Sequence, residues 1–182
     1  MEYFQLGIST NDEVPEVYTP VDEDGQCVES GKGESLVVAG TSVLLGRPPK
    51  ELPDCLDCVG GELIVSMRAA EIFSRAQMES GVRFVPTKVN TSRGEFVGDY
   101  VTITFPTFQR ILDKSRTAFR YEEGISVPLE AVAPVIASSL TKDYDIVCSV
   151  YLGNVVSKKL KMMIESAHLR GFAFTPVAVS RD

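Results

Sequence analysis

Cys55 and Cys58 form a CxxC pair, the pattern in this chain whose residue types and spacing could most directly carry chemistry. Such a pair can supply two of the four ligands of a structural zinc ion, or act as a thiol–disulfide centre. The sequence has no second CxxC and a single histidine, so the usual partners for a zinc site are missing. The neighbouring Asp54 and Asp57 disfavour the negatively charged thiolate that redox chemistry needs. We interpret both cysteines as packing residues, with a thiol enzyme as an alternative.

Three weaker patterns for catalysis each have a simpler explanation. His168 falls near the end of a predicted helix, without a G-x-S-x-G motif in the chain, and is typical of a capping or surface residue. The acids Glu122–Glu123, and Asp143 with Asp145, could form a glycosidase-like pair, but 25 acidic residues produce such neighbours by chance. Residues 25–33 have five residues between glycines where a phosphate-binding loop has four. The sequence therefore assigns no catalytic residue, metal or cofactor, and a carboxylate enzyme stays an alternative.

Acidic residues are concentrated in the first third of the chain. Residues 1–60 carry 12 acidic and 3 basic side chains, giving −9, whereas residues 61–182 carry 13 acidic and 15 basic ones, giving +2. An acidic chain without a basic stripe disfavours direct nucleic-acid binding, because phosphate contacts need clustered Lys and Arg. It suits a basic protein partner instead. The acids that we select as candidate partner-binding residues are Asp22, Glu23, Asp24, Asp54 and Asp57.

The elements that must position any site follow an internal repeat, the strongest pattern in the sequence. In each copy a serine precedes a helical apolar stripe, a glycine follows the stripe, and a strand pattern containing a proline comes next. The repeated residues are Ser66, Gly81 and Pro86 in the first copy and Ser157, Gly171 and Pro176 in the second. We expect each serine to be a helix N-cap and each glycine to end its helix in the left-handed conformation. We expect each proline at a strand end, a bulge or an edge.

Other segments are predicted with less detail. Strands are expected at residues 3–8, 99–105 and 145–152, the last of them leading into a Gly153–Asn154 turn. Residues 11–33, rich in Asp, Glu, Pro and Gly, indicate a long loop. Residues 108–120 could follow a short helical stripe, and residues 129–140 are apolar but contain Pro134, so both types stay open.

The chain is expected to be soluble and cytosolic. Its first basic residue is Lys32, which is unlike the start of a secretory signal. Its longest uncharged, mostly apolar run, Ser35–Leu45, is shorter than the roughly 20 residues of a membrane-spanning helix. A protein that is not exported normally keeps its cysteines reduced, so the four cysteines predict no disulfide framework.

The repeat also carries a resemblance to a known family. The segments concerned are Leu63–Ser66, Gly81–Pro86, Val155–Ser157 and Gly171–Pro176, with support from Ile111–Ser115, Phe119, Tyr121 and the opening Tyr3–Phe4. They resemble the myxobacterial-type immunity proteins of bacterial polymorphic toxin systems, the eleventh numbered immunity family and formerly a domain of unknown function. The resemblance covers most of residues 60–182 and thins over residues 10–55.

The resemblance implies a cytoplasmic antitoxin. Such a protein binds a cognate protein toxin, typically encoded beside it, and occludes it without catalysis. We predict an α+β fold with a mixed or antiparallel sheet and two similar strand-helix-strand units. The expected organisation is a single immunity-type domain over residues 1–182, with a loop-rich acidic region over 1–60 and a repeat-containing core over 61–182. A further alternative is an assembly or regulatory protein-binding module whose partner is not a toxin.

Overall fold

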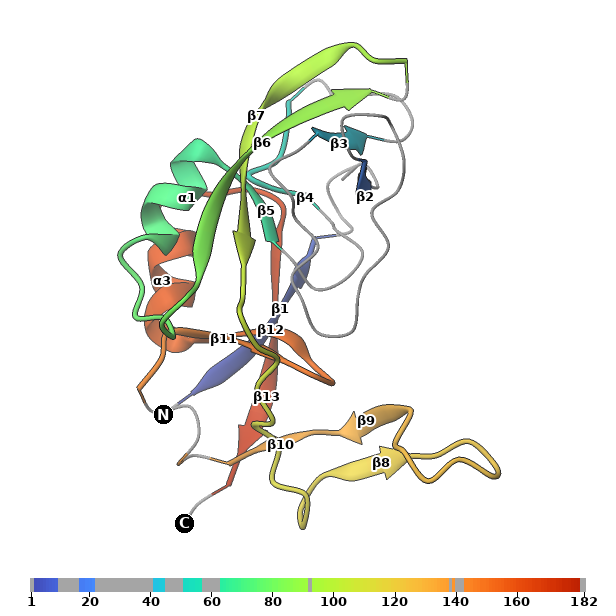
Figure 1. The fold of residues 1–182 in the computed structure, drawn as a ribbon. Coiled ribbons are helices and arrows are strands. Elements are labelled where there is room, and N and C mark those ends of the chain that lie inside the picture. Colours follow the sequence, from blue (N-terminus) through green and yellow to red (C-terminus); the bar gives the residue numbers. More distant parts are fainter. Residues whose placement is uncertain are drawn as a thin grey trace.

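Among the described residues, strands and helices are combined in two mixed sheets, a separate hairpin and two helices, which gives the predicted α+β class (Figure 1). The computed structural model describes residues 2–9, 17–21, 41–44, 51–56, 63–91, 93–137, 139 and 143–180. In Figure 1 the turn between β6 and β7 lies at one end of the elongated molecule, and the hairpin of β8 and β9 projects at the other. The helices α1 and α3 lie side by side.

The first sheet has the strand order β2-β3-β6-β7-β5-β4 and the second has the order β10-β13-β1-β12-β11. The first comprises β2 (Val17–Val21), β3 (Thr41–Leu44), β4 (Cys55–Leu56), β5 (Leu63–Ser66), β6 (Arg83–Thr91) and β7 (Phe96–Thr104). The second comprises β1 (Tyr3–Ile8), β10 (Val135–Ile136), β11 (Ile146–Ser149), β12 (Gly153–Ser157) and β13 (Phe172–Val179). The helices are α1 (Met67–Phe73) and α3 (Lys158–Ser166), and the separate hairpin comprises β8 (Ala118–Arg120) and β9 (Glu130–Ala133).

Apart from β2, which is an additional strand paired with β3, the first sheet has the same pairing scheme as the second. In the first, β7 lies between β5 and β6 and is antiparallel to both, and in the second β1 lies in the same way between β12 and β13. The outer strands also correspond: β4 is antiparallel to β5 as β11 is to β12, and β3 is parallel to β6 as β10 is to β13. The strand that completes the second sheet therefore comes from the start of the chain.

Each helix begins at the serine of its repeat. The hydroxyl of Ser66 accepts a hydrogen bond from the Ala69 amide at 3.2 Å, and the hydroxyl of Ser157 accepts one from the Leu160 amide at 3.2 Å. Both serines have extended backbone, as an N-cap requires. The local pattern of a serine before an apolar stripe is therefore enough to fix where the two helices start.

The prediction that Gly81 and Gly171 end the helices is wrong, although both have the left-handed backbone expected, with φ of 92° and 87°. α1 ends at Phe73 and α3 at Ser166. Gly171 directly precedes β13, and one residue separates Gly81 from β6. After α3 it is His168 that has positive φ, 52°. The amides of His168 and Leu169 bond back to the carbonyls of Glu165 and Ile164, which is a Schellman closure with a histidine where glycine is usual.

The two prolines lie where a missing amide costs least. Pro86 pairs with Val101 of β7, while the parallel pairing with β3 reaches only Lys88–Thr91. Pro176 pairs with Phe4 of β1, while the pairing with β10 covers only residues 178–179. Within the described part of the chain each proline is thus on a stretch of strand with one neighbour, which is a local sheet edge.

Several element predictions are corrected by the structure. Residues 108–120 contain no helix; they make isolated bridges at Gln109 and Leu112 and then form β8. The turn expected at Gly153–Asn154 falls at residues 150–152, and both residues belong to β12. Within the predicted loop 11–33, residues 17–21 form β2. The described parts of residues 1–60 supply four strands, β1 to β4.

One buried cluster joins the two repeats. Ala69 and Phe73 of α1 and Leu160 and Ile164 of α3 pack together with residues of β1, β4, β5, β7, β11 and β12. Because successive strand residues point to opposite faces, Tyr3 and its neighbours form a second cluster on the far side of the second sheet. Segment 109–112 and β10 cover that far side. This covering explains why residues 108–112 run as an extended chain.

Gly171 is predicted to be far less replaceable than Gly81. A Cβ on Gly171 would lie 2.7 Å from the Cys55 carbonyl oxygen and 2.8 Å from the Pro53 Cβ, whereas one on Gly81 would meet only the Pro106 ring, at 3.3 Å. Positive φ alone costs roughly 1–2 kcal/mol for an alanine. We expect Gly81→Ala to show about this loss, and Gly171→Ala to lose about 1–3 kcal/mol more through overpacking.

The measurement is urea unfolding of both variants, with Gly7→Ala as control. A Cβ added at Gly7 would meet only open space, and the backbone there is ordinary, so this variant should stay within about 0.5 kcal/mol of wild type. Equal losses for Gly81→Ala and Gly171→Ala would contradict the close approach between Gly171 and β4.

Candidate protein-binding site

Asp54, one of the five candidate partner-binding acids, is buried inside the fold. It is 7% exposed, and the Ser66 hydroxyl donates to its Oδ1 at 2.7 Å. The Arg68 guanidinium donates to its Oδ2 at 2.7 Å. The amide of Arg170, which lies beyond α3, also donates to Oδ2, at 2.8 Å. Asp54 thus joins the start of α1 to the chain that follows α3.

Asp145 makes the corresponding contacts in the second repeat, and joins the start of α3 to the chain that follows α1. It is also 7% exposed, and the Ser157 hydroxyl donates to its Oδ1 at 2.8 Å. The Lys159 ammonium donates to Oδ2 at 2.6 Å, and the amide of Gln77, which lies beyond α1, donates to the same oxygen at 3.0 Å. Each carboxylate therefore lies twelve residues before the serine of its own helix and accepts a backbone hydrogen bond from beyond the other helix.

Both carboxylates are held in the charged form. Burial by itself would raise the pKa of Asp54, but hydrogen bonds from Arg68, Ser66 and the Arg170 amide outweigh it and lower the pKa below its usual value. For Asp145 burial again acts upward, and hydrogen bonds from the Gln77 amide, Lys159 and Ser157 lower the pKa. Groups with this many internal donors have a structural role, and Asp54 has little surface to offer a partner.

The other sequence candidates are not brought together. Asp22, Glu23, Asp24, Asp57 and Cys58 lie outside the described residues. Cys55 lies buried in β4, 1% exposed. Glu122–Glu123 and His168 are exposed, as is Asp143 beside the buried Asp145. In the described part of the chain no three Cys, His, Asp or Glu side chains gather as metal ligands would.

A groove of about 470 Å³ lies where the second sheet meets the hairpin of β8 and β9. Its walls come from residues 109–112 and Lys114, from the hairpin and from the end of β11 with the turn after it. The aromatic side chains in the lining are Phe119, Tyr121 and Tyr151. The charged ones are Arg110 and Lys114, and no acidic residue of the described chain lines the groove. Its volume lies within the range of pockets that take a ligand or a few side chains of a partner.

Large apolar side chains are exposed around this groove. We call residues 117–133 the arm; it contains the whole hairpin of β8 and β9. Between 48% and 63% of the residue surface is exposed for Tyr121, Ile125, Val127, Leu129 and Val132. Phe108 and Val150, at the base of the arm, are also exposed. Scattered single apolar residues need no explanation, but such a group on one projecting element is typical of a surface that binds another protein.

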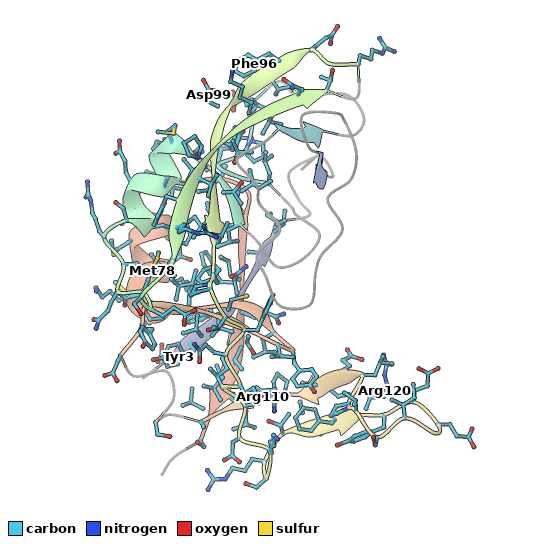
Figure 2. All side chains as sticks on the ribbon, viewed as in Figure 1. Tyr3, Met78, Phe96, Asp99, Arg110 and Arg120 are labelled. Carbon is cyan, nitrogen blue, oxygen red and sulfur yellow. The ribbon has the colours of Figure 1, made fainter. Side chains whose placement is uncertain are left out.

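The arm is fixed to the second sheet at its base. Thr117 Oγ1 accepts a hydrogen bond from the Val135 amide at 3.1 Å, and the ring of Phe119 packs edge-on against Tyr151 with centroids 5.5 Å apart. Across the hairpin, Arg120 and Glu130 form an ion pair at 2.6 Å. Figure 2 shows Arg110 where the chain enters this region and Arg120 out on the arm. The base is therefore held in place while the apolar side chains beyond it face solvent.

Sequence reasoning misses this surface. The sequence pattern assigns no type to residues 108–120 and 129–140, and its charge distribution favours the acidic N-terminal region instead. A signal is present: Ile125, Val127 and Leu129 alternate with polar or proline residues, as a strand with one apolar face does. The pattern indicates an apolar face, but it cannot say that no core covers that face.

The described residues form an α+β protein with an exposed apolar surface on a projecting arm. Residues 4–179 match the Immunity protein family (Imm11), and the chain belongs to this family. Membership implies toxin neutralisation in general and a cognate toxin as partner, and immunity proteins are generally not catalysts. No curated protein matches the chain. Of the helices described, none is long and apolar enough to cross a membrane.

Removing the charge of either buried aspartate should destabilise the protein more than removing its exposed cation. Asp54→Asn or Asp145→Asn leaves hydrogen-bond donors without a charged acceptor, and we expect each to cost about 2–3 kcal/mol at pH 7. Arg68→Ala and Lys159→Ala remove cations that are more than half exposed, and should cost at most about 1 kcal/mol each. Urea unfolding at pH 7 provides the comparison, and equal losses within a pair would contradict the structural role of the carboxylate.

Acid should reduce the difference between wild type and the asparagine variants. The folded pKa of Asp54 and of Asp145 is lowered, so their contribution is fully present above the unfolded value of about 3.9 and is lost as the pH falls through the folded values. The free energy of unfolding of wild type should therefore fall more steeply below pH 4 than that of Asp54→Asn or Asp145→Asn. Parallel pH profiles would show that these groups are not the ones that titrate.

Proposed function

We propose that this chain binds a cognate toxin, encoded nearby, in the cytoplasm of the cell that makes it, and blocks the toxin by occlusion. The observation that carries the proposal is the family match over residues 4–179. An exposed apolar surface on an arm with a fixed base suits a protein that works by contact. Occlusion needs only tight binding over or beside the toxin's active site.

Action without catalysis is part of this proposal. The hydroxyls of Ser66 and Ser157 are engaged as N-caps and as donors to buried carboxylates, which leaves them poorly placed as nucleophiles. Cys55 is buried in β4. The burial of Cys55 disfavours a thiol enzyme, and the family match favours a toxin inhibitor over a carboxylate enzyme or an assembly module.

We also propose that the two strand-helix-strand segments are equivalent units. They share strand order, the serine N-caps, and a buried aspartate twelve residues before each serine. A basic residue two positions after each serine, Arg68 or Lys159, completes both sets. Because each aspartate accepts an amide from beyond the other unit's helix, the pair would act as one rigid scaffold that presents the binding surface.

The direct test is neutralisation of the adjacent-encoded toxin. Co-expression of the chain should restore growth of cells that make this toxin, and the purified proteins should co-elute and show loss of the toxin's activity at equimolar amounts. Protection without a complex, or at amounts of the chain far below equimolar, would contradict occlusion. An enzyme that destroys the toxin or its product needs neither a stable complex nor equal amounts. Absence of both protection and binding would contradict the toxin assignment for that neighbour.

Charge in the N-terminal region is proposed to speed association with a basic toxin surface. Replacing Asp22, Glu23, Asp24 and Asp57 by their amides should slow association about threefold or more at low salt and leave dissociation little changed. Asp54 is left intact because its carboxylate is buried. Stopped-flow association at two salt concentrations measures the effect.

A matched control removes four acids elsewhere. The control variant amidates the exposed residues Glu71, Glu95, Asp99 and Asp143, so that both variants lose the same net charge. If the two variants slow association equally, total charge rather than the N-terminal region is responsible. Unchanged rates in the N-terminal variant would leave those acids with a solubility role only.

A further inference from the structure

We propose that the arm and the groove at its base form the anchor surface for the toxin, and that the groove takes a toxin segment with an acidic residue beside an aromatic or aliphatic side chain. This inference rests on the proposed function, since it names the surface and the chemistry through which the toxin is held. It is independent of the acidic N-terminal region, which is proposed to act on the rate of association.

The arm has the properties of a surface that lacks its partner. Within the described residues, β8 and β9 pair only with each other, and a two-stranded hairpin without a covered apolar face has marginal stability. Val127, Leu129 and Val132 of the arm are each more than half exposed. Covering them would remove apolar surface from water, at roughly 25 cal/mol per Å². A partner is the natural source of that cover.

The groove sets the chemistry of the anchor. Its aromatic walls, Phe119, Tyr121 and Tyr151, suit an inserted aromatic or aliphatic side chain. Arg110 and Lys114 line the same groove and are exposed, and neither makes an ion pair with a described residue. A lining with these two cations and no described acid is complementary to a carboxylate.

The neighbouring cations on the arm and at its base are already paired. Arg116 is paired with Asp113, and Arg120 is paired with Glu130 on the arm. Cations that stabilise the hairpin and its base are thus already neutralised within the chain, while the two that line the groove are left for another carboxylate. An acidic segment of the toxin fits both the charge and the apolar walls.

Two variants test the two halves of the proposal. Arg110→Glu with Lys114→Glu should weaken binding to the adjacent-encoded toxin at least tenfold by reversing the charge at the groove. Leu129→Asp should weaken it at least tenfold by placing a charge on the apolar arm, at a position outside the lining of the groove. Because these side chains are exposed, both variants should keep the wild-type melting temperature. Affinities are measured by titration calorimetry with the purified toxin.

Matched controls carry the same changes away from the arm. Lys88→Glu with Arg93→Glu reverses two exposed cations near the β6–β7 turn, and Met162→Asp places a charge at an exposed apolar position of α3. Both should bind the toxin as wild type does. An equal loss in controls and arm variants would overturn the assignment to the arm.

The remaining outcomes separate this inference from the proposed function. If wild type binds the toxin and the arm variants bind equally well, the inference is wrong and the proposed function stands. If wild type does not bind the toxin, the proposed function fails and the inference falls with it. Sedimentation of the chain alone tests whether a second copy of the chain occupies the arm. A dimer that Leu129→Asp converts to monomer, with toxin affinity unchanged, would overturn the inference.

Discussion

Two buried carboxylates hold the arrangement of this protein together. Asp54 and Asp145 each accept hydrogen bonds from a serine and a cation at the start of one helix and from a backbone amide beyond the other helix. A carboxylate taken out of water without such donors costs several kcal/mol. Separating the repeat that contains α1 from the repeat that contains α3 would remove a backbone hydrogen-bond donor from both carboxylates. The positions of the helices, of β4 and of the segments after each helix all depend on this mutual satisfaction.

The same contacts explain where sequence reasoning succeeds and where it fails. The helix starts at Ser66 and Ser157 are predictable because an N-cap is decided by a serine and the few residues after it. The helix ends are not, because the Gln77 amide donates to the Asp145 carboxylate and the Asp145 amide donates to the Gln77 carbonyl, which requires the chain to have left the helix by Gln77. Nothing within the local pattern around Gln77 reveals a partner 68 residues away. The α+β class and the family follow from the repeat, which is visible along the chain.

The binding surface is harder to predict for a different reason. Apolar residues such as Val127 and Val132 favour a strand, and strands of this composition normally cover a core. Whether a core exists beneath them depends on how the arm leaves the second sheet, which is decided by contacts such as Phe119 with Tyr151. Whether the apolar side chains of the arm are exposed is therefore decided by the folded structure as a whole. The composition of the arm predicts only that these side chains are apolar. The acidic region is easier to notice, because charge can be counted without a structure.

The place of β1 in the second sheet has a consequence for how the chain is made. β1 leaves the ribosome well before its neighbours β12 and β13, since they span Gly153–Ser157 and Phe172–Val179. At 5–20 residues per second, β1 waits on the order of ten seconds or more without a partner strand. Closing so long a loop is also slow in itself, because the chain loses conformational entropy before the contacts between distant residues can stabilise the fold. A cell that relies on this protein for protection thus depends on a delay built into the order of its strands, and a nascent chain exposes the edges of Tyr3–Ile8 throughout that time.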